Sequence, residues 1–290
     1  MLVQEAIAEG KRLLESSSAE ALVDTPMLDA SLLLGETLNK SRTDLIVSGK
    51  EPIAENDFKK FLGLLERRRS GECIAYILGR REFRGLDFAV NPNVLVPRPD
   101  TETLMEAALE YIDVTTKQGN SNPSLLDLCT GSGALAISLK NEHPHLNVTA
   151  SDISAKALET AKQNAENLLP KMHGINFIKG DLFEKINCKF DLIISNPPYI
   201  PSGELSSLAP EVRREPRLAL DGGGDGLKII RRIISRSPDH LRGSGVLLME
   251  AGPSQMPAIR ALMEKNSFSG IRIYKDLAGR DRVIAATLCR

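Results

Sequence analysis

Two spacings of apolar residues divide the chain into different kinds of segment. From residue 2 to residue 80, apolar positions recur every three or four residues, which is the spacing of one helix face. This spacing is seen at Leu2, Ala6, Leu13 and Leu14, and again over 27–38 and 58–65. We therefore predict a small helical domain over residues 1–81.

A short segment of different character follows. Residues 82–97 mix large apolar side chains with Gly85 and with the turn-forming run Asn91-Pro92-Asn93. Apolar residues on both sides of such a run are typical of a β-hairpin. We expect the hairpin to turn at 91–93 and to link the helical domain to the rest of the chain.

From Thr101 onward, apolar runs of strand length alternate with segments of helical spacing. The expected apolar strand segments are 124–129, 146–151, 175–179, 190–195, 245–250 and 282–288, and the expected helices are 101–112, 133–141, 154–168, 226–241 and 254–266. Such alternation predicts an α/β domain with a mostly parallel sheet and helices on both faces. We assign this domain to residues 98–290.

The charge balance argues against a protein that grips nucleic acid. The net charge is −1, with 13 basic and 14 acidic side chains in residues 1–85 and 24 of each in the remainder. Because duplex-binding proteins concentrate Lys and Arg on one face, we expect no stable direct binding to nucleic acid. The run Arg67-Arg68-Arg69 is better explained as a helix end where cations suit the dipole. A patch that contacts a partner is the alternative.

Other sequence features favour a cytoplasmic protein. No run of 18 apolar residues is present, so no membrane span is expected, and the first residues lack the basic and apolar regions of a secretory signal. His143 and His145 have no Cys or acidic ligands nearby, so we expect no metal site. Reduced thiols fit the four scattered cysteines better than disulfides do, and these are Cys73, Cys129, Cys188 and Cys289.

The run Asn196-Pro197-Pro198-Tyr199 directly follows the expected strand 190–195. The lone pair of a planar NH2 group is delocalised, so the group is a poor nucleophile until two acceptors hold its two N–H bonds. The Asn196 side-chain oxygen and the Pro197 carbonyl offer two such acceptors, and Pro198 keeps Pro197 extended. Tyr199 offers a flat face for stacking on a π plane. The pattern indicates methylation of a planar nitrogen, although a strand-ending turn is the simpler alternative.

Three further positions fall at the ends of expected strands, where ligands bind in such sheets. The first is the turn Asp127-Leu128-Cys129-Thr130-Gly131-Ser132-Gly133, whose glycines allow close approach of the backbone to a ligand. The second is Asp152, a carboxylate that can accept two ribose hydroxyls. The third is Asp181-Leu182, in which the acid can accept from an adenine amino group while Leu182 covers the ring.

These positions distinguish two classes of cofactor. A dinucleotide site requires G-x-G-x-x-G, and here Ala136 takes the third glycine position, which that pattern sometimes allows. An acid before the glycines, Asp127, favours S-adenosylmethionine, because its amino group is cationic and it carries no phosphate. Together with Asp152, Asp181 and Asn196, this acid indicates S-adenosylmethionine as the cofactor.

Nearly the whole chain resembles the peptide chain release factor glutamine N5-methyltransferases, the PrmC/HemK family. Besides the glycine turn and the Asn196 motif, the resemblance rests on residues 72–79, Arg84, Phe88, the run Val96-Pro97-Arg98-Pro99-Asp100-Thr101-Glu102, and residues 211–216 and 219–223. Two residues depart from the family pattern. Cys129 replaces a frequent glycine, and Cys73 stands where proline is common.

The resemblance implies a class I S-adenosylmethionine-dependent methyltransferase with a Rossmann-like fold. Its implied reaction moves a methyl group to the side-chain amide nitrogen of the glutamine in the Gly-Gly-Gln motif of class I release factors, which modulates translation termination. The implied cofactor contacts are Cys129, Thr130, Gly131, Ser132, Gly133, Asp152, Leu182 and Asn196. Asn196 through Tyr199 would contact the glutamine, and the helical domain would dock the release factor.

Several alternatives stay open. Arg98, Asp100 and Glu102 resemble orienting residues near the cofactor, or else they form a structural ion pair and cap the helix 101–112. An adenine-N6 methyltransferase of DNA or RNA would use the same planar NH2 chemistry, but it would need a basic groove. A non-catalytic module that binds translation factors would not need the intact Asn196 motif.

Overall fold

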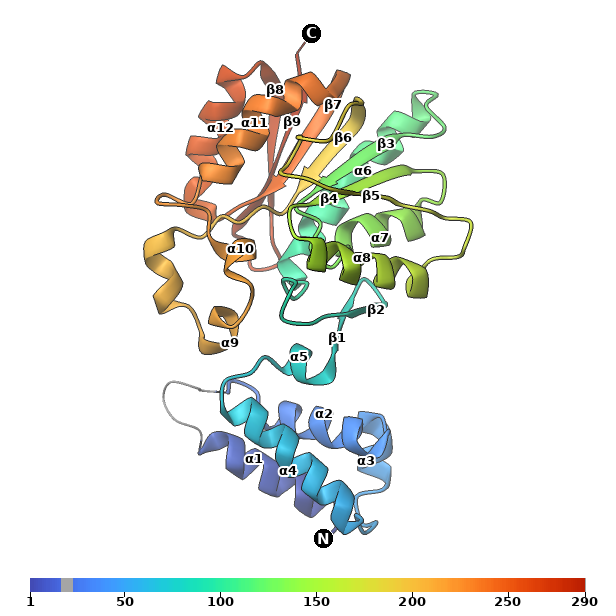
Figure 1. Ribbon diagram of the computed structural model, residues 1–290, viewed down its shortest axis with the longest axis vertical. Coiled ribbons are helices and arrows are strands. Elements are labelled where there is room, and N and C mark those ends of the chain that lie inside the picture. Colours follow the sequence, from blue (N-terminus) through green and yellow to red (C-terminus); the bar gives the residue numbers. More distant parts are fainter. Residues whose placement is uncertain (17–22, 290) are drawn as a thin grey trace. The chain divides into compact units, whose positions relative to one another are not determined.

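The computed structural model describes residues 1–16 and 23–289 and divides them into two compact units (Figure 1). The first unit comprises residues 1–80 and the separate segment 207–214. The second comprises residues 81–206 and 215–290. Nothing in the sequence pattern indicated that 207–214 would belong with the N-terminal residues.

The first unit is helical. Its N-terminal helices are α1 (Val3–Glu15), α2 (Pro26–Leu38), α3 (Arg42–Val47), α4 (Glu55–Arg69) and α5 (Ile74–Leu78). A capping box begins α3, where Ser41 Oγ accepts from the Asp44 amide and the Asp44 carboxylate accepts from the Ser41 amide. The core is built from the apolar positions at helical spacing, among them Leu14, Leu33 and Phe61.

The short helix α9 (Pro210–Arg213) is held in this unit by a buried cation. Arg68, at the end of α4, pairs with Asp29 Oδ2 at 2.7 Å and with Glu211 Oε2 at 2.8 Å. Arg214 hydrogen bonds to Ser70. Because a buried guanidinium is costly unless it is paired, Arg68 ties α9 to α2 and α4.

The hairpin lies earlier in the chain than expected. Its strands are β1 (Arg80–Phe83) and β2 (Leu86–Ala89), so the predicted turn at 91–93 is wrong. The chain turns at Arg84 and Gly85, which have φ angles of 53° and 75°, the left-handed pair that suits a two-residue hairpin turn. Residues 91–94 form a separate turn, in which the Asn91 side chain accepts from the Asn93 amide.

The second unit is built on a seven-stranded sheet of order β5-β4-β3-β6-β7-β9-β8. Its strands are β3 (Ser124–Leu128), β4 (Asn147–Asp152), β5 (Asn176–Lys179), β6 (Phe190–Ser195), β7 (Leu241–Glu250), β8 (Phe268–Lys275) and β9 (Asp281–Leu288). The strands β3 to β7 pair in parallel, and β9 runs antiparallel to both β7 and β8. The mostly parallel sheet predicted from the sequence is thus confirmed.

Helices cover both faces of this sheet. They are α6 (Glu102–Lys117), α7 (Ala134–Glu142), α8 (Ala155–Leu168), α11 (Lys228–His240) and α12 (Met256–Lys265), with α10 (Arg217–Leu220) and the 3₁₀ helices η2 (Pro99–Thr101), η3 (Ser202–Ser207) and η4 (Pro253–Gln255) in connections. Leu125 packs in the same cluster as α6 and α7, whereas its neighbour Leu126 packs with α11 and α12. Successive strand residues point to opposite faces, so each buried strand contributes side chains to the apolar cores on both faces of the sheet.

The strand β8 was not among the predicted elements. It lies at the edge of the sheet, pairs only with β9, and buries fully only Phe268. Gly270, with φ of 60°, lies where the register shifts. An edge strand with one buried side chain and a bulge lacks the apolar run that identified the central strands.

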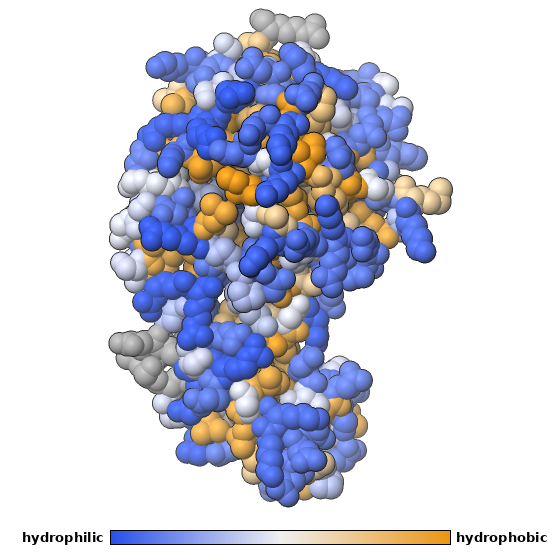
Figure 2. All heavy atoms as spheres, in the orientation of Figure 1, coloured by the Kyte–Doolittle hydropathy of each residue, from blue (hydrophilic) through white to orange (hydrophobic). Residues whose placement is uncertain are grey.

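Polar side chains cover most of the face seen in Figure 2, and apolar ones gather in smaller patches. Large apolar side chains that are exposed include Ile46 and Val47 in α3. Among the described residues, no helix has the length and apolar character needed to cross a bilayer.

Asn164 on α8 joins the hairpin to the turn that follows β3. Its Oδ1 accepts from the Ala89 amide at 2.8 Å, and its Nδ2 donates to the carbonyls of Ala89 and Ser132 at 3.0 and 2.9 Å. The side chain is buried, so its removal would leave the Ala89 amide and the carbonyls of Ala89 and Ser132 without hydrogen-bond partners and away from water.

We expect Asn164→Ala to lower the free energy of unfolding by about 3 kcal/mol, because buried polar groups lose their partners. Urea titration of the purified variant measures this change. The matched control is Asn167→Ala on the same helix, since Asn167 is exposed. Equal stability of the two variants would show that Asn164 does not hold the hairpin.

Candidate active site

The register of the parallel strands aligns four residues along the edge of the sheet that is formed by the carboxyl ends of these strands. Leu128 lies opposite Ser151 and Ser195, and Ser195 lies opposite Met249. The next residue on each of these segments therefore falls in one row at the carboxyl ends of β3, β4, β6 and β7. This row is Cys129, Asp152, Asn196 and Glu250.

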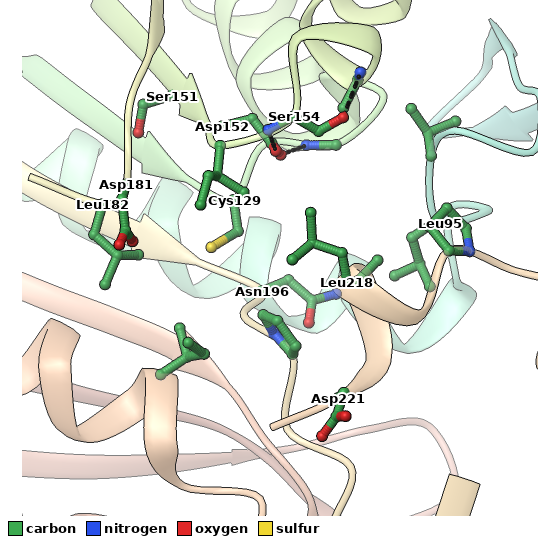
Figure 3. A pocket seen from close by; sticks show the side chains of 18 of the residues that line it. Leu95, Cys129, Ser151, Asp152, Ser154, Asp181, Leu182, Asn196, Leu218 and Asp221 are labelled. Carbon is green, nitrogen blue, oxygen red and sulfur yellow. Dashed lines mark hydrogen bonds between the residues drawn. The ribbon is translucent and has the colours of Figure 1, made fainter. Parts of the chain in front are cut away.

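A cavity of about 190 Å³ lies at this edge (Figure 3). Cys129, Gly131, Asp152, Asp181, Leu182, Asn196 and Pro198 line it, and these all come from the strand ends singled out in the sequence. Leu95 and Leu218, which were not singled out, contribute apolar lining from outside the sheet. The cavity thus combines a few polar groups with apolar walls, as small-molecule sites do.

Asp152 is the main carboxylate of the cavity. Its Oδ2 accepts from the Gly131 amide at 3.0 Å and its Oδ1 accepts from the Ser154 amide at 2.8 Å. These bonds hold the carboxylate in one orientation and leave further lone pairs for a ligand. Burial raises the pKa of Asp152, and the backbone amides act against that rise.

Asp181 and Leu182 lie beside Asp152 in the cavity wall. Asp181 Oδ2 pairs with Arg232 Nη2 of α11 at 2.8 Å. Leu182 has a φ angle of 55°, which is uncommon for a residue with a side chain. Such a conformation costs on the order of 1–3 kcal/mol, and it places the Leu182 side chain against the cavity.

Only some residues of the glycine turn 127–133 line the cavity. Cys129 and Gly131 line the cavity, and both have positive φ angles, of 61° and 58°. The left-handed backbone at Cys129 explains why glycine suits this position and why cysteine is a departure. Gly133 is not in the lining, and a side chain there would meet Ile137 Cδ1 at 2.8 Å, so its role is close packing of helices.

Asp127, Thr130 and Ser132 are buried and lie outside the cavity lining. The Thr130 hydroxyl donates to Asp127 Oδ2 at 2.6 Å, whereas Asp127 Oδ1 has no hydrogen bond of ordinary geometry among the described residues. Burial raises the pKa of Asp127 to about 7. Asp127 therefore stabilises the turn through Thr130, and its predicted contact with the cofactor stays a prediction.

Asn196 presents its side chain to the cavity with Pro198, while Pro197 is buried. The Asn196 Nδ2 donates to Thr101 Oγ1 at 3.2 Å. Since the amide nitrogen is engaged there, the Asn196 oxygen is left for the cavity. This is the orientation that an acceptor for a substrate NH2 requires.

Tyr199 and Glu250 lie behind the cavity. The Tyr199 hydroxyl donates to Glu250 Oε1 at 3.3 Å. The Tyr199 ring packs against the apolar core that includes α11 and α12. Burial raises the pKa of Tyr199, and it raises the pKa of Glu250 to about 7. Tyr199 is not in the lining. Glu250 was not among the residues predicted from the sequence, although it ends the predicted strand 245–250, and ligands bind at strand ends.

Arg98, Asp100 and Glu102 make ion pairs in the structure. Arg98 pairs with the buried Glu215, Asp100 pairs with Arg282 at 2.9 Å and Arg280 at 3.4 Å, and Glu102 lies 3.9 Å from Arg84. No side-chain hydrogen bond caps η2 or α6. The structural alternative for this run is therefore present as ion pairs and absent as a helix cap, and the orienting role near the cofactor stays a prediction.

The cavity suits a cofactor that carries a ribose and no phosphate. Among the described residues that line it, the acids are Asp152, Asp181 and Asp221, and the one cation, Arg232, is paired with Asp181. A phosphate would meet carboxylates there, whereas ribose hydroxyls find acceptors and an adenine ring finds Leu182 and Ile153. Among the described residues, no group of three or more His, Cys, Asp or Glu side chains is placed to hold a metal ion.

Known proteins resemble the chain along most of its length. The methyltransferase small domain family matches residues 112–225, and the PrmC N-terminal domain family matches residues 5–79. The release factor glutamine methyltransferase of Neisseria gonorrhoeae is 41% identical over 261 residues, which cover 89% of this chain and 92% of the relative. The enzyme of that name from Geobacter sulfurreducens is 38% identical, with 93% and 92% covered.

The fold recurs in more distant proteins. A crystal structure of a methyltransferase from Pyrococcus furiosus superposes with a TM-score of 0.53 at 18% identity, and it covers 72% of this chain and 91% of that chain. It supports the methyltransferase fold predicted from the sequence. The family resemblance is confirmed by the relatives, which are 38–41% identical over about nine-tenths of the chain: the chain belongs to the release factor glutamine methyltransferase family.

Proposed function

We propose that this protein transfers a methyl group from S-adenosylmethionine to the side-chain amide nitrogen of the glutamine in the Gly-Gly-Gln motif of class I release factors. The observation that carries the proposal is the position of Asn196. Its amide oxygen is free to face a cavity that is also lined by Asp152, the last residue of β4. An acceptor for a planar NH2 group thus lies beside an acceptor for ribose hydroxyls.

When bound, S-adenosylmethionine supplies a sulfonium methyl group that a nitrogen lone pair can attack. Asn196 Oδ1 and the Pro197 carbonyl accept the two N–H bonds of the glutamine amide and hold its nitrogen in line with that methyl. Orientation of this kind contributes on the order of 7 kcal/mol or more to lowering a barrier. The bound cofactor would supply this methyl group as its carbon–sulfur bond breaks with the electron pair kept by sulfur, and the methylated amide would lose its extra proton to water.

The other site residues take supporting roles in this proposal. Asp152 binds the ribose, and Asp181 and Leu182 hold the adenine. Cys129 and Gly131 form the wall beside the cofactor, while Thr130, Ser132, Gly133 and Asp127 maintain the turn. Pro198 stiffens the motif, and Tyr199 is braced by Glu250, so it supports the substrate-binding backbone.

We also propose that residues 1–81 dock the release factor, with 82–97 as linker and 98–290 as the catalytic domain. The lining of the cavity begins at Asn93, and it includes none of the described residues among 1–81. Their own core leaves exposed apolar side chains such as Ile46 and Val47. A class I release factor as substrate places the enzyme in translation termination and therefore in the cytoplasm, where its four cysteines stay reduced.

The reaction itself is tested with labelled cofactor. Tritium from the methyl group of S-adenosylmethionine should appear in a purified class I release factor and not in plasmid DNA offered as a competing acceptor. A release factor with glutamine replaced by alanine in its Gly-Gly-Gln motif is the control. Label in the DNA would favour the adenine-N6 alternative.

Replacing Asp152 tests the ribose contact. Asp152→Ala should weaken binding of S-adenosylmethionine by about 1–3 kcal/mol, because the ribose hydroxyls lose a charged acceptor. Calorimetry measures the dissociation constant, and Asp87→Ala in the exposed part of β2 is the matched control. Unchanged affinity would remove Asp152 from the cofactor site.

Replacing Asn196 separates chemistry from cofactor binding. Asn196→Ala should reduce kcat by about 100-fold or more while most of the cofactor affinity stays, because the lost acceptor serves the nucleophile. Steady-state assays at saturating cofactor give kcat, and Asn167→Ala is the matched control. Normal turnover with weakened cofactor binding would reverse this assignment.

Removing the helical residues tests docking. A chain that begins near Phe83 should keep its cofactor affinity, while kcat/KM for the intact release factor should fall, because remote binding energy no longer orients the glutamine. Calorimetry with the cofactor checks that the shortened chain folds. If it methylates the release factor as efficiently as the full chain, residues 1–81 serve stability and not docking.

A further inference from the structure

The orientation of the Asn196 amide has a structural cause one residue away from the cavity. An asparagine side chain can place either its oxygen or its nitrogen toward a ligand, and only the oxygen can accept from a substrate NH2. Here the nitrogen donates to Thr101 Oγ1 at 3.2 Å. Thr101 ends η2, and its side chain is buried.

A threonine hydroxyl has one proton, so the use of that proton decides what its oxygen can accept. The carboxylate of Glu250 lies beside the Thr101 hydroxyl, which acts against the rise in the Glu250 pKa that burial causes. Glu250 Oε2 is buried and has no hydrogen-bond partner among the described residues, so it is open to accept the proton of the Thr101 hydroxyl. While the proton is directed at Glu250, Thr101 Oγ1 can only accept from Asn196.

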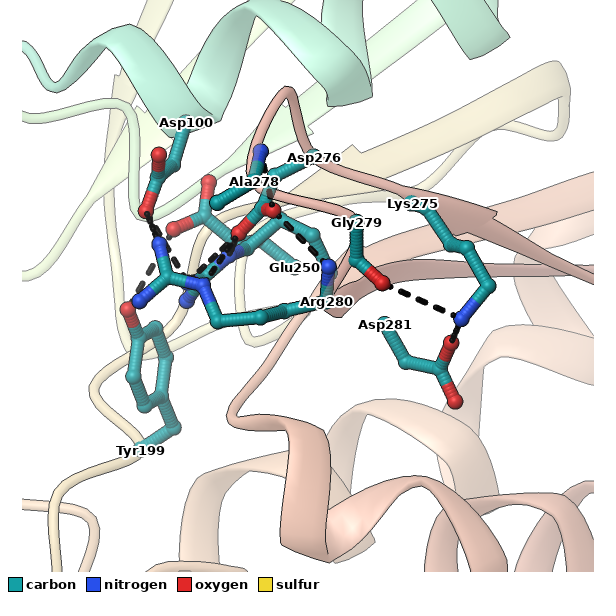
Figure 4. A network of polar contacts seen from close by, with 10 residues as sticks. Asp100, Tyr199, Glu250, Lys275, Asp276, Ala278, Gly279, Arg280 and Asp281 are labelled. Atoms are coloured by element: carbon teal, nitrogen blue, oxygen red, sulfur yellow. Dashed lines mark hydrogen bonds and ion pairs between the residues drawn. The ribbon is translucent and has the colours of Figure 1, made fainter.

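The surroundings of Glu250 explain how a buried carboxylate is kept beside the site (Figure 4). The Tyr199 hydroxyl donates to Oε1, and the guanidinium of Arg282 on β9 attracts the carboxylate. Arg282 is itself shared with Asp276 and with Asp100 of η2, and the charge of Asp100 repels Glu250. The negative charge of Glu250 is thus only partly balanced, so its carboxylate can accept a further hydrogen bond from a hydroxyl group.

We infer that Thr101 and Glu250 are positioning residues that keep the Asn196 oxygen turned toward the substrate nitrogen. Glu250 accepts the Thr101 proton, Thr101 Oγ1 accepts from Asn196 Nδ2, and the Asn196 oxygen is left for the cavity. The inference rests on the proposed function for the identity of the substrate. It goes beyond that function because neither residue touches the cavity.

The relay predicts a pH dependence with a definite sign. Burial raises the pKa of Glu250 to about 7, so the carboxylate is ionised above this pH and protonated below it. A protonated Glu250 can donate to Thr101, whose hydroxyl can then donate to the Asn196 oxygen and turn the amide around. The activity should therefore rise with pH through about 7 and reach a plateau above it.

The main test compares Thr101→Val with Thr101→Ser in methylation of a class I release factor. Valine keeps the shape of threonine and removes the hydroxyl, so kcat/KM should fall about tenfold, as expected for one orienting hydrogen bond. Serine keeps the hydroxyl and should stay within about twofold of the unmodified protein. Cofactor affinity from calorimetry should be unchanged in both. Equal activity of the two variants would overturn the role of Thr101.

The role of Glu250 is tested by the pH profile of Glu250→Gln. Glutamine cannot titrate but can still accept from Thr101 through Oε1, so the rise of kcat/KM near pH 7 should disappear. A purely structural role would lower activity at every pH and leave the rise in place. Persistence of the rise in Glu250→Gln would overturn the role of Glu250.

A measurement without turnover keeps the two proposals separate. In ¹⁵N-labelled protein, the side-chain NH2 resonances of Asn196 are those lost in Asn196→Ala. They should shift in Thr101→Val and stay in place in Thr101→Ser. If the unmodified protein methylates no release factor, the proposed function fails, and this shift still decides whether Thr101 orients Asn196. Resonances that are identical in both Thr101 variants would overturn the inference.

Discussion

The parallel pairing of β3 with β4 and β6, and of β6 with β7, is the constraint on which the site depends. This register places Leu128, Ser151, Ser195 and Met249 in one row, so the residues that follow them meet at one edge. A slip of one residue in any strand would turn its end residue to the other face of the sheet. Burial of both faces by separate apolar cores specifies the register strongly.

Three carboxyl groups near this edge are buried, and burial raises the pKa of each. Asp152 has two backbone amides as partners, Asp127 has Thr130, and Glu250 has Tyr199. Only Asp152 faces the cavity. Asp127 and Glu250 instead bond to residues of the turn after β3 and of the Asn196 motif, so acids of similar burial have different partners according to what surrounds them.

The segment between the Asn196 motif and α11 connects the two compact units along the chain. It leaves the second unit after residue 206, contributes α9 to the first unit through Glu211 and Arg68, and returns at Glu215. Glu215 then accepts from the Val96 amide and pairs with Arg98. The run around Arg98 and the segment 211–216 were both part of the family resemblance. Their pairing gives a structural reason for the presence of Arg98, Glu211 and Glu215.

The sequence by itself specified the strands whose apolar runs are buried on both faces, and the polar residues that end them. A polar residue directly after a buried strand is typical of a turn or a ligand site. For this reason the sequence alone identified Asp152, Asp181 and Asn196 as candidate site residues. The edge strand β8 and the turn at Arg84 could not be found, because one buried side chain and a left-handed arginine leave no periodic signal.

Only the tertiary structure decided which predicted residues face the cavity and which support it. Asp127 and Gly133 stand in the same turn as Gly131, yet they are buried beneath it. Thr101 is far from Asn196 in the sequence and contacts it from η2, and Glu250 lies beside Thr101 at the end of β7. The reason is physical: periodicity reports the burial of an element along its own length, whereas contacts between residues distant in sequence depend on how strands pair and how helices pack.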